Sequence, residues 1–365
     1  MKKKIVLFAI ICISIVFLIN LNIHKDKSIN NLNAYKPYQI MHAYGIDQLN
    51  VKGRNQKIAV IVPYGSSTIE KDLEIFNSQF NLEPANLKIF YPQGEAKTQN
   101  YSWALETSLD VEWIHALAPK ASIFLIVAKS DSTSDLLSAI KYTTDMDVNI
   151  VSMSWAINEF NEETSYESYF KNKNITFIAS AGDNSSGINW PAVSPNVLAV
   201  GGTTFSLDSK GNLISPETGW SESSGGISKY MPEPKYQIDY GINTNGYRAI
   251  PDVSFYADEL KGVAVYCSPV YNNQTGWTTL AGTSLGAPSW AAFIALVNEE
   301  NNTPITNIHD KLYKLAKNKE QYSINFRDIT SGNTNLNNTN KGYDYVTGLG
   351  SPLENNLYKT LIENN

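Results

Sequence analysis

Short apolar runs alternate with longer helical stretches along the chain, and this alternation limits the fold more than any other feature. The run Ile123–Val127 is apolar at every position, which is typical of parallel strands covered on both faces. A β–α alternation with right-handed crossovers builds one packed sheet. We therefore expect an α/β fold with a mostly parallel central sheet flanked by helices. The expected strands are Lys57–Val62, Leu87–Tyr91, Ala121–Val127, Val148–Ser152, Ile175–Ala179 and Val197–Gly201, and the expected helices are Glu70–Gln79, Ser102–Leu117, Ser134–Thr144 and Ser284–Glu300.

The first 30 residues have the pattern of an export segment. Lysines after Met1 precede an apolar run from Ile5 to Ile19, as in secretory signals. Apolar character continues to Ile23 without a small-x-small cleavage site, so an uncleaved membrane anchor stays open. Lysines before the run place the following part on the outer side. We expect residues 1–30 to be a signal peptide or anchor, residues 31–365 to be one folded domain, and the protein to be secreted or extracytoplasmic.

Composition agrees with an exported globular protein of 365 residues. The hydrophobic content of 42% suffices for a large core, and the formal net charge of −6 gives no reason to expect nucleic acid binding. The two cysteines are Cys12, in the export segment, and Cys267, so no intrachain disulfide is expected. We expect a monomer.

A turn of small residues, Gly282-Thr283-Ser284, leads into the apolar helical run Trp290–Val297. Such a turn exposes the serine hydroxyl and points backbone N–H groups and the positive helix end at its surroundings. This arrangement suits a nucleophile that forms an anionic tetrahedral intermediate. The alternative is a serine that only caps the helix. The choice depends on which base is available.

Histidine is the usual base for a serine, and the chain has four. His24 follows the export segment, while His42 and His309 have no supporting motif. His115 lies on the expected helix Ser102–Leu117, but on its polar side. A Ser-His-Asp triad is therefore not expected, and a neutral subtilisin-like mechanism is the weakest interpretation.

Carboxylates in the segment Tyr101–Leu117 offer another base. At about 100° per residue, Glu106 and Asp110 lie on one face with Trp103 and Trp113, and this face should be buried. Repulsion and burial both oppose full ionisation, so such a pair can share or relay a proton for a serine. A solvated acidic pair is the alternative. Three polar residues on the opposite side are expected to meet water: Ser108, Glu112 and His115.

Asp183 follows the apolar run Asn174–Ala179, in the Gly-containing turn Ser180–Gly187. The carboxyl end of a strand is where open α/β sheets place their sites. A protonated aspartate there can donate a hydrogen bond to an oxyanion. The alternative is an aspartate that only stabilises the turn.

Together these motifs resemble the sedolisin family, the serine-carboxyl peptidases. The resemblance extends from about Tyr35 to the C-terminus and includes Trp220–Gly226 and Arg248–Ser254. It implies a subtilisin-like fold and a serine-type endopeptidase or tripeptidyl-peptidase that cleaves polypeptides through an acyl-enzyme. Because a carboxylate base must be partly ionised while Asp183 keeps its proton, we expect activity at acidic pH. The roles it implies are Ser284 as nucleophile, Glu106 as base, Asp110 as the acid supporting that base, and Asp183 in the oxyanion hole.

The C-terminal region contains two aspartates among glycines and turns, Asp328 and Asp344. Turns of this kind offer the oxygen ligands that a hard cation takes. Two turn-forming aspartates in an Asn-rich loop are the simpler interpretation. The resemblance implies one calcium ion, bound by both carboxylates and by the carbonyls of Ile329, Asn340 and Gly342.

Two features depart from the family pattern. Some relatives extend the triad with a glutamate where this chain has Val62, although the usual tryptophan neighbour is present as Trp155. Family members usually carry a large folded prodomain, whereas here a short segment precedes residue 35. These departures leave a second class open, a catalytically silent surface protein that binds peptides or proteins.

Overall fold

The computed structural model describes residues 29, 32–185, 187–271, 274–301 and 304–363, and this part has the expected α/β fold. Its central sheet has seven parallel strands in the order β12-β8-β6-β4-β1-β3-β2, and β9 joins β8 antiparallel. All the expected strands are present. The strands of this sheet are β1 (Lys57–Pro63), β2 (Asn86–Phe90), β3 (Ser122–Ala128), β4 (Ile150–Met153), β6 (Thr176–Ser180), β8 (Val197–Thr204), β9 (Thr218–Gly219) and β12 (Val253–Tyr256).

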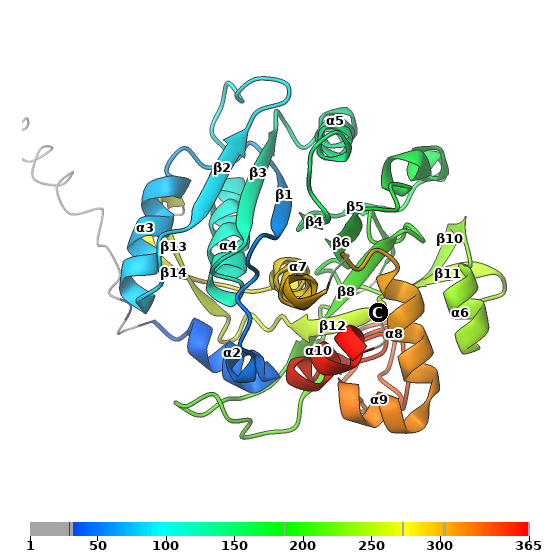
Figure 1. Cartoon of the computed structure of the whole chain (residues 1–365). Helices are drawn as coiled ribbons and strands as arrows, with labels where there is room; N and C mark the ends of the chain where they lie inside the picture. Colours follow the sequence, from blue (N-terminus) through cyan, green and yellow to red (C-terminus); the bar gives the residue numbers. More distant parts are fainter. Residues whose placement is uncertain (1–28, 30–31, 186, 272–273, 302–303, 364–365) are drawn as a thin grey trace, which may run out of the picture.

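Helices cover both faces of the sheet. Figure 1 shows α4 and α7 on one face and α5 on the other, in agreement with their contacts with the strands. Helix η3 packs against α5 and β10. Helix α7 is buried along nearly its whole length and packs against α4 and the central strands. The helices of the described residues are α2 (Pro37–Tyr44), η2 (Ile46–Gln48), α3 (Ile69–Phe80), α4 (Tyr101–Leu117), α5 (Thr133–Thr144), η3 (Asn161–Phe170), α6 (Lys235–Tyr240), α7 (Thr283–Glu300), α8 (Ile308–Lys317), α9 (Lys319–Asn325) and α10 (Glu354–Glu363).

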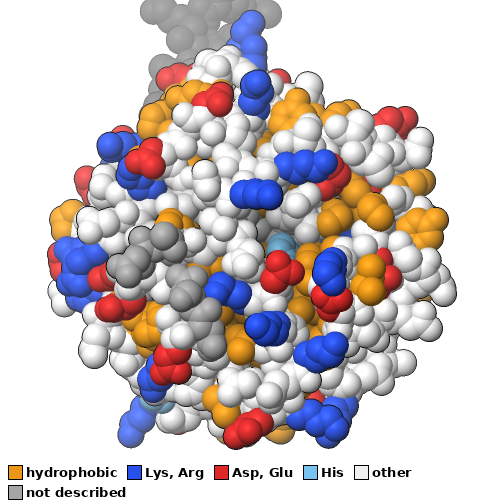
Figure 2. Space-filling model, turned by 45° about the vertical axis from the view of Figure 1, so that its right-hand side comes forward, with side chains coloured by type: hydrophobic (Ala, Val, Ile, Leu, Met, Phe, Trp, Pro, Cys, Tyr) orange, Lys and Arg blue, Asp and Glu red, His pale blue; other side chains and the backbone are white. Residues whose placement is uncertain are grey.

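Short antiparallel pairs surround this frame. They are β5 (Ile157–Asn158) with β7 (Asn189–Trp190), β10 (Gly226–Pro232) with β11 (Tyr247–Ile250), β13 (Val263–Tyr271) with β14 (Gln274–Leu280), and β15 (Phe326–Arg327) with β16 (Ser351–Pro352). Figure 2 shows one face of the molecule, on which acidic and basic side chains lie interspersed among neutral and apolar ones.

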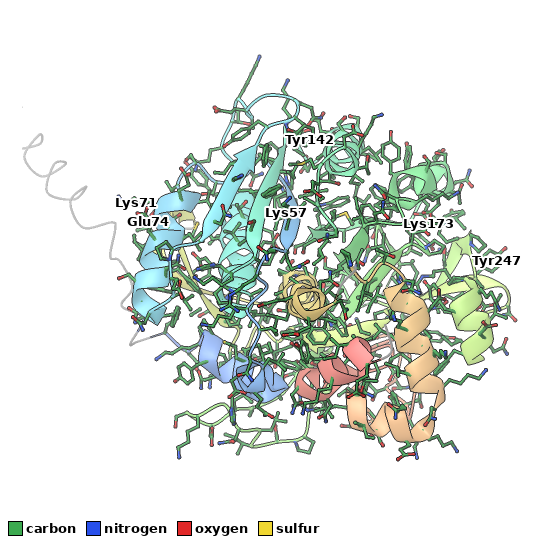
Figure 3. The ribbon with its side chains drawn as sticks, viewed as in Figure 1. Lys57, Lys71, Glu74, Tyr142, Lys173 and Tyr247 are labelled. Atoms are coloured by element: carbon green, nitrogen blue, oxygen red, sulfur yellow. The ribbon has the colours of Figure 1, made fainter. Side chains whose placement is uncertain are left out.

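The parallel strands place all their carboxyl ends at one edge of the sheet and their amino ends at the other. Lys57, labelled in Figure 3, begins β1 and forms an ion pair with Asp147, which precedes β4. This pair marks the amino edge. Ser154 follows β4 and Asp183 follows β6, so both lie at the carboxyl edge, where such sheets bind ligands.

Helix α4 is not amphipathic, and the expectation that one of its sides meets water is wrong. Ser108, Glu112 and His115 are all fully buried. The hairpin β13–β14 covers this side, and the Tyr266 N–H donates to Glu112 Oε2 at 3.0 Å. His115 Nε2 lies 2.8 Å from the carbonyl oxygen of Glu83. The hydrophobic periodicity of α4 could not predict this burial, because the covering residue Tyr266 lies 154 positions after Glu112 in the chain.

Among the described residues, no helix is both long enough and apolar enough to cross a membrane. The expected export segment, residues 1–30, lies outside the described residues except for Ile29.

Candidate active site

Ser284 lies in the first turn of α7, just after the glycine that permits this turn. Gly282 has φ +108°, a value that favours glycine, and a β-carbon there would overlap Asp183 Oδ2. The Gly282 N–H donates to the carbonyl of Ala257 at 2.8 Å. Ser284 is partly exposed although most of α7 is buried. The fold thus presents this serine at the accessible end of a buried helix.

Glu106 and Asp110 lie on successive turns of α4, which packs against α7. Asn100 caps α4 by accepting hydrogen bonds from two backbone N–H groups of the first turn. The Ser284 hydroxyl lies within hydrogen-bonding reach of the Glu106 carboxyl. Asp110 is fully buried, and its Oδ1 accepts a hydrogen bond of 2.7 Å from Ser154 Oγ. The expected nucleophile and both of its expected carboxyl partners are therefore brought together.

Burial makes the two carboxyls a proton-holding pair. It raises the pKa of Glu106 well above its usual range, the Asp110 charge raises it further, and the hydrogen bond with Ser284 opposes the rise. Burial also raises the pKa of Asp110 to about 8, against the opposing effect of Ser154. Glu106 Oε1 and Asp110 Oδ2 are buried without a hydrogen-bond partner. A proton on either atom relieves its burial, and the charge of one carboxyl opposes ionisation of the other, so the pair titrates as a unit.

Asp183 lies in the turn after β6, against the first residue of α7. Its Oδ1 accepts hydrogen bonds from the N–H and the hydroxyl of Thr283, at 2.8 and 2.6 Å. The Gly182 N–H donates to the same hydroxyl at 3.0 Å. Although part of Asp183 is exposed, burial of its carboxyl raises its pKa; Thr283 opposes the rise, and the charges of Glu259 and Glu222 add to it. The raised pKa favours the neutral carboxyl, which can donate a hydrogen bond.

The described histidines have partners elsewhere. His42 Nδ1 lies 2.7 Å from a carboxylate of η2, and His115 contacts a backbone carbonyl beside α4. His309 lies 3.5 Å from the carboxylate of Asp252. His24 is outside the described residues.

Sequence reasoning missed Ser154. Its Oγ lies 2.7 Å from Asp110 Oδ1 and 3.1 Å from the Ser284 carbonyl oxygen. The available signal was its place directly after a buried strand, at the same sheet edge as Asp183. The neighbouring Trp155 donates from Nε1 to the carbonyl of Ile61 at 3.1 Å, so the strand backbone satisfies this indole.

The expected calcium ligands also lie together. The Gly342 N–H donates to Asp328 Oδ1 at 2.9 Å, and the Asn340 N–H donates to Asp344 Oδ2 at 3.1 Å. Both carboxylates therefore contact one loop, and Ile329 follows Asp328 directly. No cluster of three or more His, Cys, Asp or Glu side chains with metal-site geometry occurs in the described residues. The expected set needs only two such side chains, and its oxygen donors have the chemistry that calcium prefers.

A model of the Subtilase family matches residues 96–342. Kumamolisin of Bacillus sp. (strain MN-32) is 28% identical, over 90% of this chain and 64% of kumamolisin. Tripeptidyl-peptidase 1 of Dictyostelium discoideum is 29% identical, over 80% of this chain and 52% of that protein. The chain thus spans less than two thirds of the length of either relative. Among solved structures, Pseudomonas sedolisin, a serine-carboxyl proteinase complexed with two molecules of pseudo-iodotyrostatin, superposes with a TM-score of 0.81 at 25% identity, covering 91% of this chain and 98% of sedolisin.

The family match spans well over half of the chain, so the chain belongs to the subtilase family. Within this family it groups with the sedolisin and kumamolisin serine-carboxyl peptidases, as both the sequence relatives and the superposition show.

Proposed function

We propose that this protein is an exported serine peptidase that hydrolyses polypeptides through an acyl-enzyme at Ser284. The observation that carries the proposal is the contact between the Ser284 hydroxyl and Glu106, which forms a buried pair with Asp110. Export is supported by the basic and apolar segment of residues 1–23, and fractionation of expressing cells tests it.

In the proposed reaction, Glu106 first accepts a proton from Ser284 and later gives it to the leaving amine. Glu106 accepts the hydroxyl proton while Ser284 Oγ attacks the scissile carbonyl carbon. Protonated Asp183 and the positive end of α7 stabilise the resulting oxyanion. The C–N bond then breaks, and Glu106 returns the proton to the leaving amine. Water repeats the sequence with Glu106 as base, which releases the acyl group and restores Ser284, while Asp110 orients Glu106 throughout.

An acidic working range follows from these roles. The pair Glu106–Asp110 must have lost one proton to act as a base, whereas Asp183 must keep its proton to donate. Activity falls at low pH as the pair becomes fully protonated, and at higher pH as Asp183 ionises. We place the optimum below neutrality, which requires that the first ionisation of the pair, the one that frees Glu106, occurs at a lower pH than the ionisation of Asp110 at about 8.

Calcium binding belongs to the same proposal. Asp328 and Asp344 would hold the ion together with the carbonyls of Ile329, Asn340 and Gly342. The ion would supply charge neutralisation and rigidity in the C-terminal loop, which contains none of the proposed catalytic residues. The contacts of both carboxylates with the loop 340–342 support this assignment.

Two serines of α7 provide a matched test of the nucleophile. Ser289 lies one turn beyond Ser284, and its hydroxyl donates within the helix to the Leu285 carbonyl at 2.7 Å. Ser284→Ala should reduce hydrolysis of a fluorogenic peptide by roughly 10⁴-fold or more, whereas Ser289→Ala should stay within about twofold. Equal activity of Ser284→Ala and the unmodified protein would remove Ser284 as the nucleophile.

The alternative is a catalytically silent relative that binds peptides. This alternative would be established by a folded protein that binds a substrate-like peptide without an aldehyde group but does not hydrolyse peptides. Such a protein would also show no fluorophosphonate labelling at Ser284. Labelling that disappears in Ser284→Ala would exclude it.

A further inference from the structure

Ser154 joins two parts of the site. Its side chain is 3% exposed, and its Oγ lies 2.7 Å from Asp110 Oδ1 and 3.1 Å from the Ser284 carbonyl oxygen. One buried hydroxyl thus contacts both the acid pair and the peptide group of the nucleophile.

The Ser284 carbonyl needs a donor from outside its helix. In an α-helix this carbonyl accepts from the N–H four residues later. Here that residue is Pro288, which has no N–H. Ser154 Oγ lies 3.1 Å from this carbonyl and 2.7 Å from Asp110 Oδ1, and the shorter distance assigns the single hydroxyl hydrogen to Asp110.

The two oxygens of Asp110 have different surroundings. Oδ1 contacts Ser154, whereas Oδ2 is buried without a partner, as is Glu106 Oε1. Leaving two buried polar atoms unpaired is costly, so a proton held by the pair is favoured on one of these atoms. A donor at Oδ1 favours this arrangement, because it makes Oδ1 the poorer site for the proton.

We propose that Ser154 is a positioning residue that acts through Asp110. By donating to Oδ1, it keeps the proton of Asp110 on Oδ2 and stabilises the ionised form of the pair, and so holds Glu106 ready to accept the Ser284 proton. This inference rests on the proposed function, since it concerns the same site.

Few charged groups act on this pair. The carboxyls that influence Glu106 are Asp110 on α4 and Asp183 in the turn after β6, while α7 contributes the neutral Ser284. For Asp110 the surroundings that matter are burial and the Ser154 hydroxyl. A change at Ser154 is therefore expected to appear in the titration of the pair.

Ser152 supplies the matched control for this test. It lies on β4, is fully buried, and its Oγ has no hydrogen-bond partner. Ser154→Ala should lower kcat by about 10- to 100-fold with KM changed by less than about twofold. The acid limb of its kcat profile should move up by about one pH unit, because the ionised pair loses a donor. Ser152→Ala should keep the kcat and the acid limb of the unmodified protein.

Restoring the hydroxyl separates positioning from a structural role. Ser154→Thr should return the acid limb towards that of the unmodified protein. An unmoved limb in folded Ser154→Ala would overturn the proposal, as would an equal shift in Ser152→Ala. If Ser154→Ala does not fold, Ser154→Cys, a weaker donor of similar size, should show a smaller shift in the same direction, and no shift would overturn the proposal.

A readout without turnover distinguishes this inference from the proposed function. Carboxyl-carbon NMR titration in the Ser284→Ala background reports the pair directly, and adding Ser154→Ala should raise its apparent pKa. An unchanged titration would overturn the role of Ser154 even if Ser284 is the nucleophile. Loss of the nucleophile assignment would appear instead as undiminished hydrolysis by Ser284→Ala.

Discussion

At the scale of single residues, surroundings decide what each buried carboxyl does. Asp110 and Asp252 are both fully buried. Burial raises the pKa of Asp110 to about 8, because the residue has a serine rather than a cation beside it. Burial would raise the pKa of Asp252 too, but Arg248 at 2.6 Å holds it well below its usual range. The first is suited to hold a proton in catalysis, and the second forms a permanent ion pair.

The substitution Asp183→Asn tests whether the carboxyl proton of Asp183 is needed, while it keeps a side chain of the same shape in the same place. The amide oxygen can keep the hydrogen bonds from Thr283, and the amide N–H donates at every pH. We expect the decline of kcat/KM towards neutral pH to disappear in Asp183→Asn, with a maximum lowered by about 10- to 100-fold. Asp183→Ala should lose about 10²- to 10³-fold at every pH. A full pH–rate profile that keeps the alkaline decline in Asp183→Asn would contradict the assigned role.

At the scale of elements, burial on both faces made the central strands predictable. Strand β3 is an example, because an apolar residue at nearly every position indicates that both faces of the strand are covered. The strand β12 was not predicted, although β4, which has the same four-residue length, was. Likewise, the spacing of Glu106 and Asp110 predicted that they share a face of α4, but nothing within α4 reports the hairpin β13–β14 that covers Glu112.

Glu112 provides a stability test of that cover. Burial raises its pKa well above the usual range, so the folded protein holds it neutral, with Oε2 accepting from the Tyr266 N–H. Glu112→Gln keeps an acceptor and should change the free energy of unfolding by less than about 1 kcal/mol at mildly acidic pH. Glu112→Ala should lower it by about 2–3 kcal/mol, because it leaves a cavity and removes the carboxyl oxygen that accepts from the Tyr266 N–H. Equal losses in urea denaturation would contradict a neutral Glu112.

At the scale of the whole molecule, the buried carboxyls make stability depend on pH. Burial raises the pKa of Asp110 to about 8 and that of Glu163 to about 7. A carboxyl whose folded pKa exceeds its unfolded value of about 4 contributes stability that is fully present below that value and is lost as pH rises through the folded pKa. We expect unfolding of Ser284→Ala, which avoids autolysis, to show a loss of a few kcal/mol between about pH 5 and 8. Stability that is constant or rises over this range would contradict the assigned protonation states.

Calcium bound at the C-terminal loop should also raise the free energy of unfolding. Free calcium at about 100 times its Kd should stabilise the fold by about 2.7 kcal/mol. Asp344→Ala should lose this response, whereas Asp145→Ala, which removes an exposed acid at the end of α5, should keep it. Melting curves with and without chelator at mildly acidic pH measure the effect. A midpoint of the unmodified protein that does not respond to the chelator would remove the calcium site.

The central claim is that carboxyl groups, rather than a histidine, transfer the protons at Ser284. The pH dependence of kcat/KM for a fluorogenic peptide, across about pH 3 to 9, tests it most directly. The account predicts a bell-shaped profile with its maximum in the acidic range, an acid limb from the pair Glu106–Asp110 and an alkaline limb from Asp183. A maximum at about pH 8 with a flat acid side would contradict it.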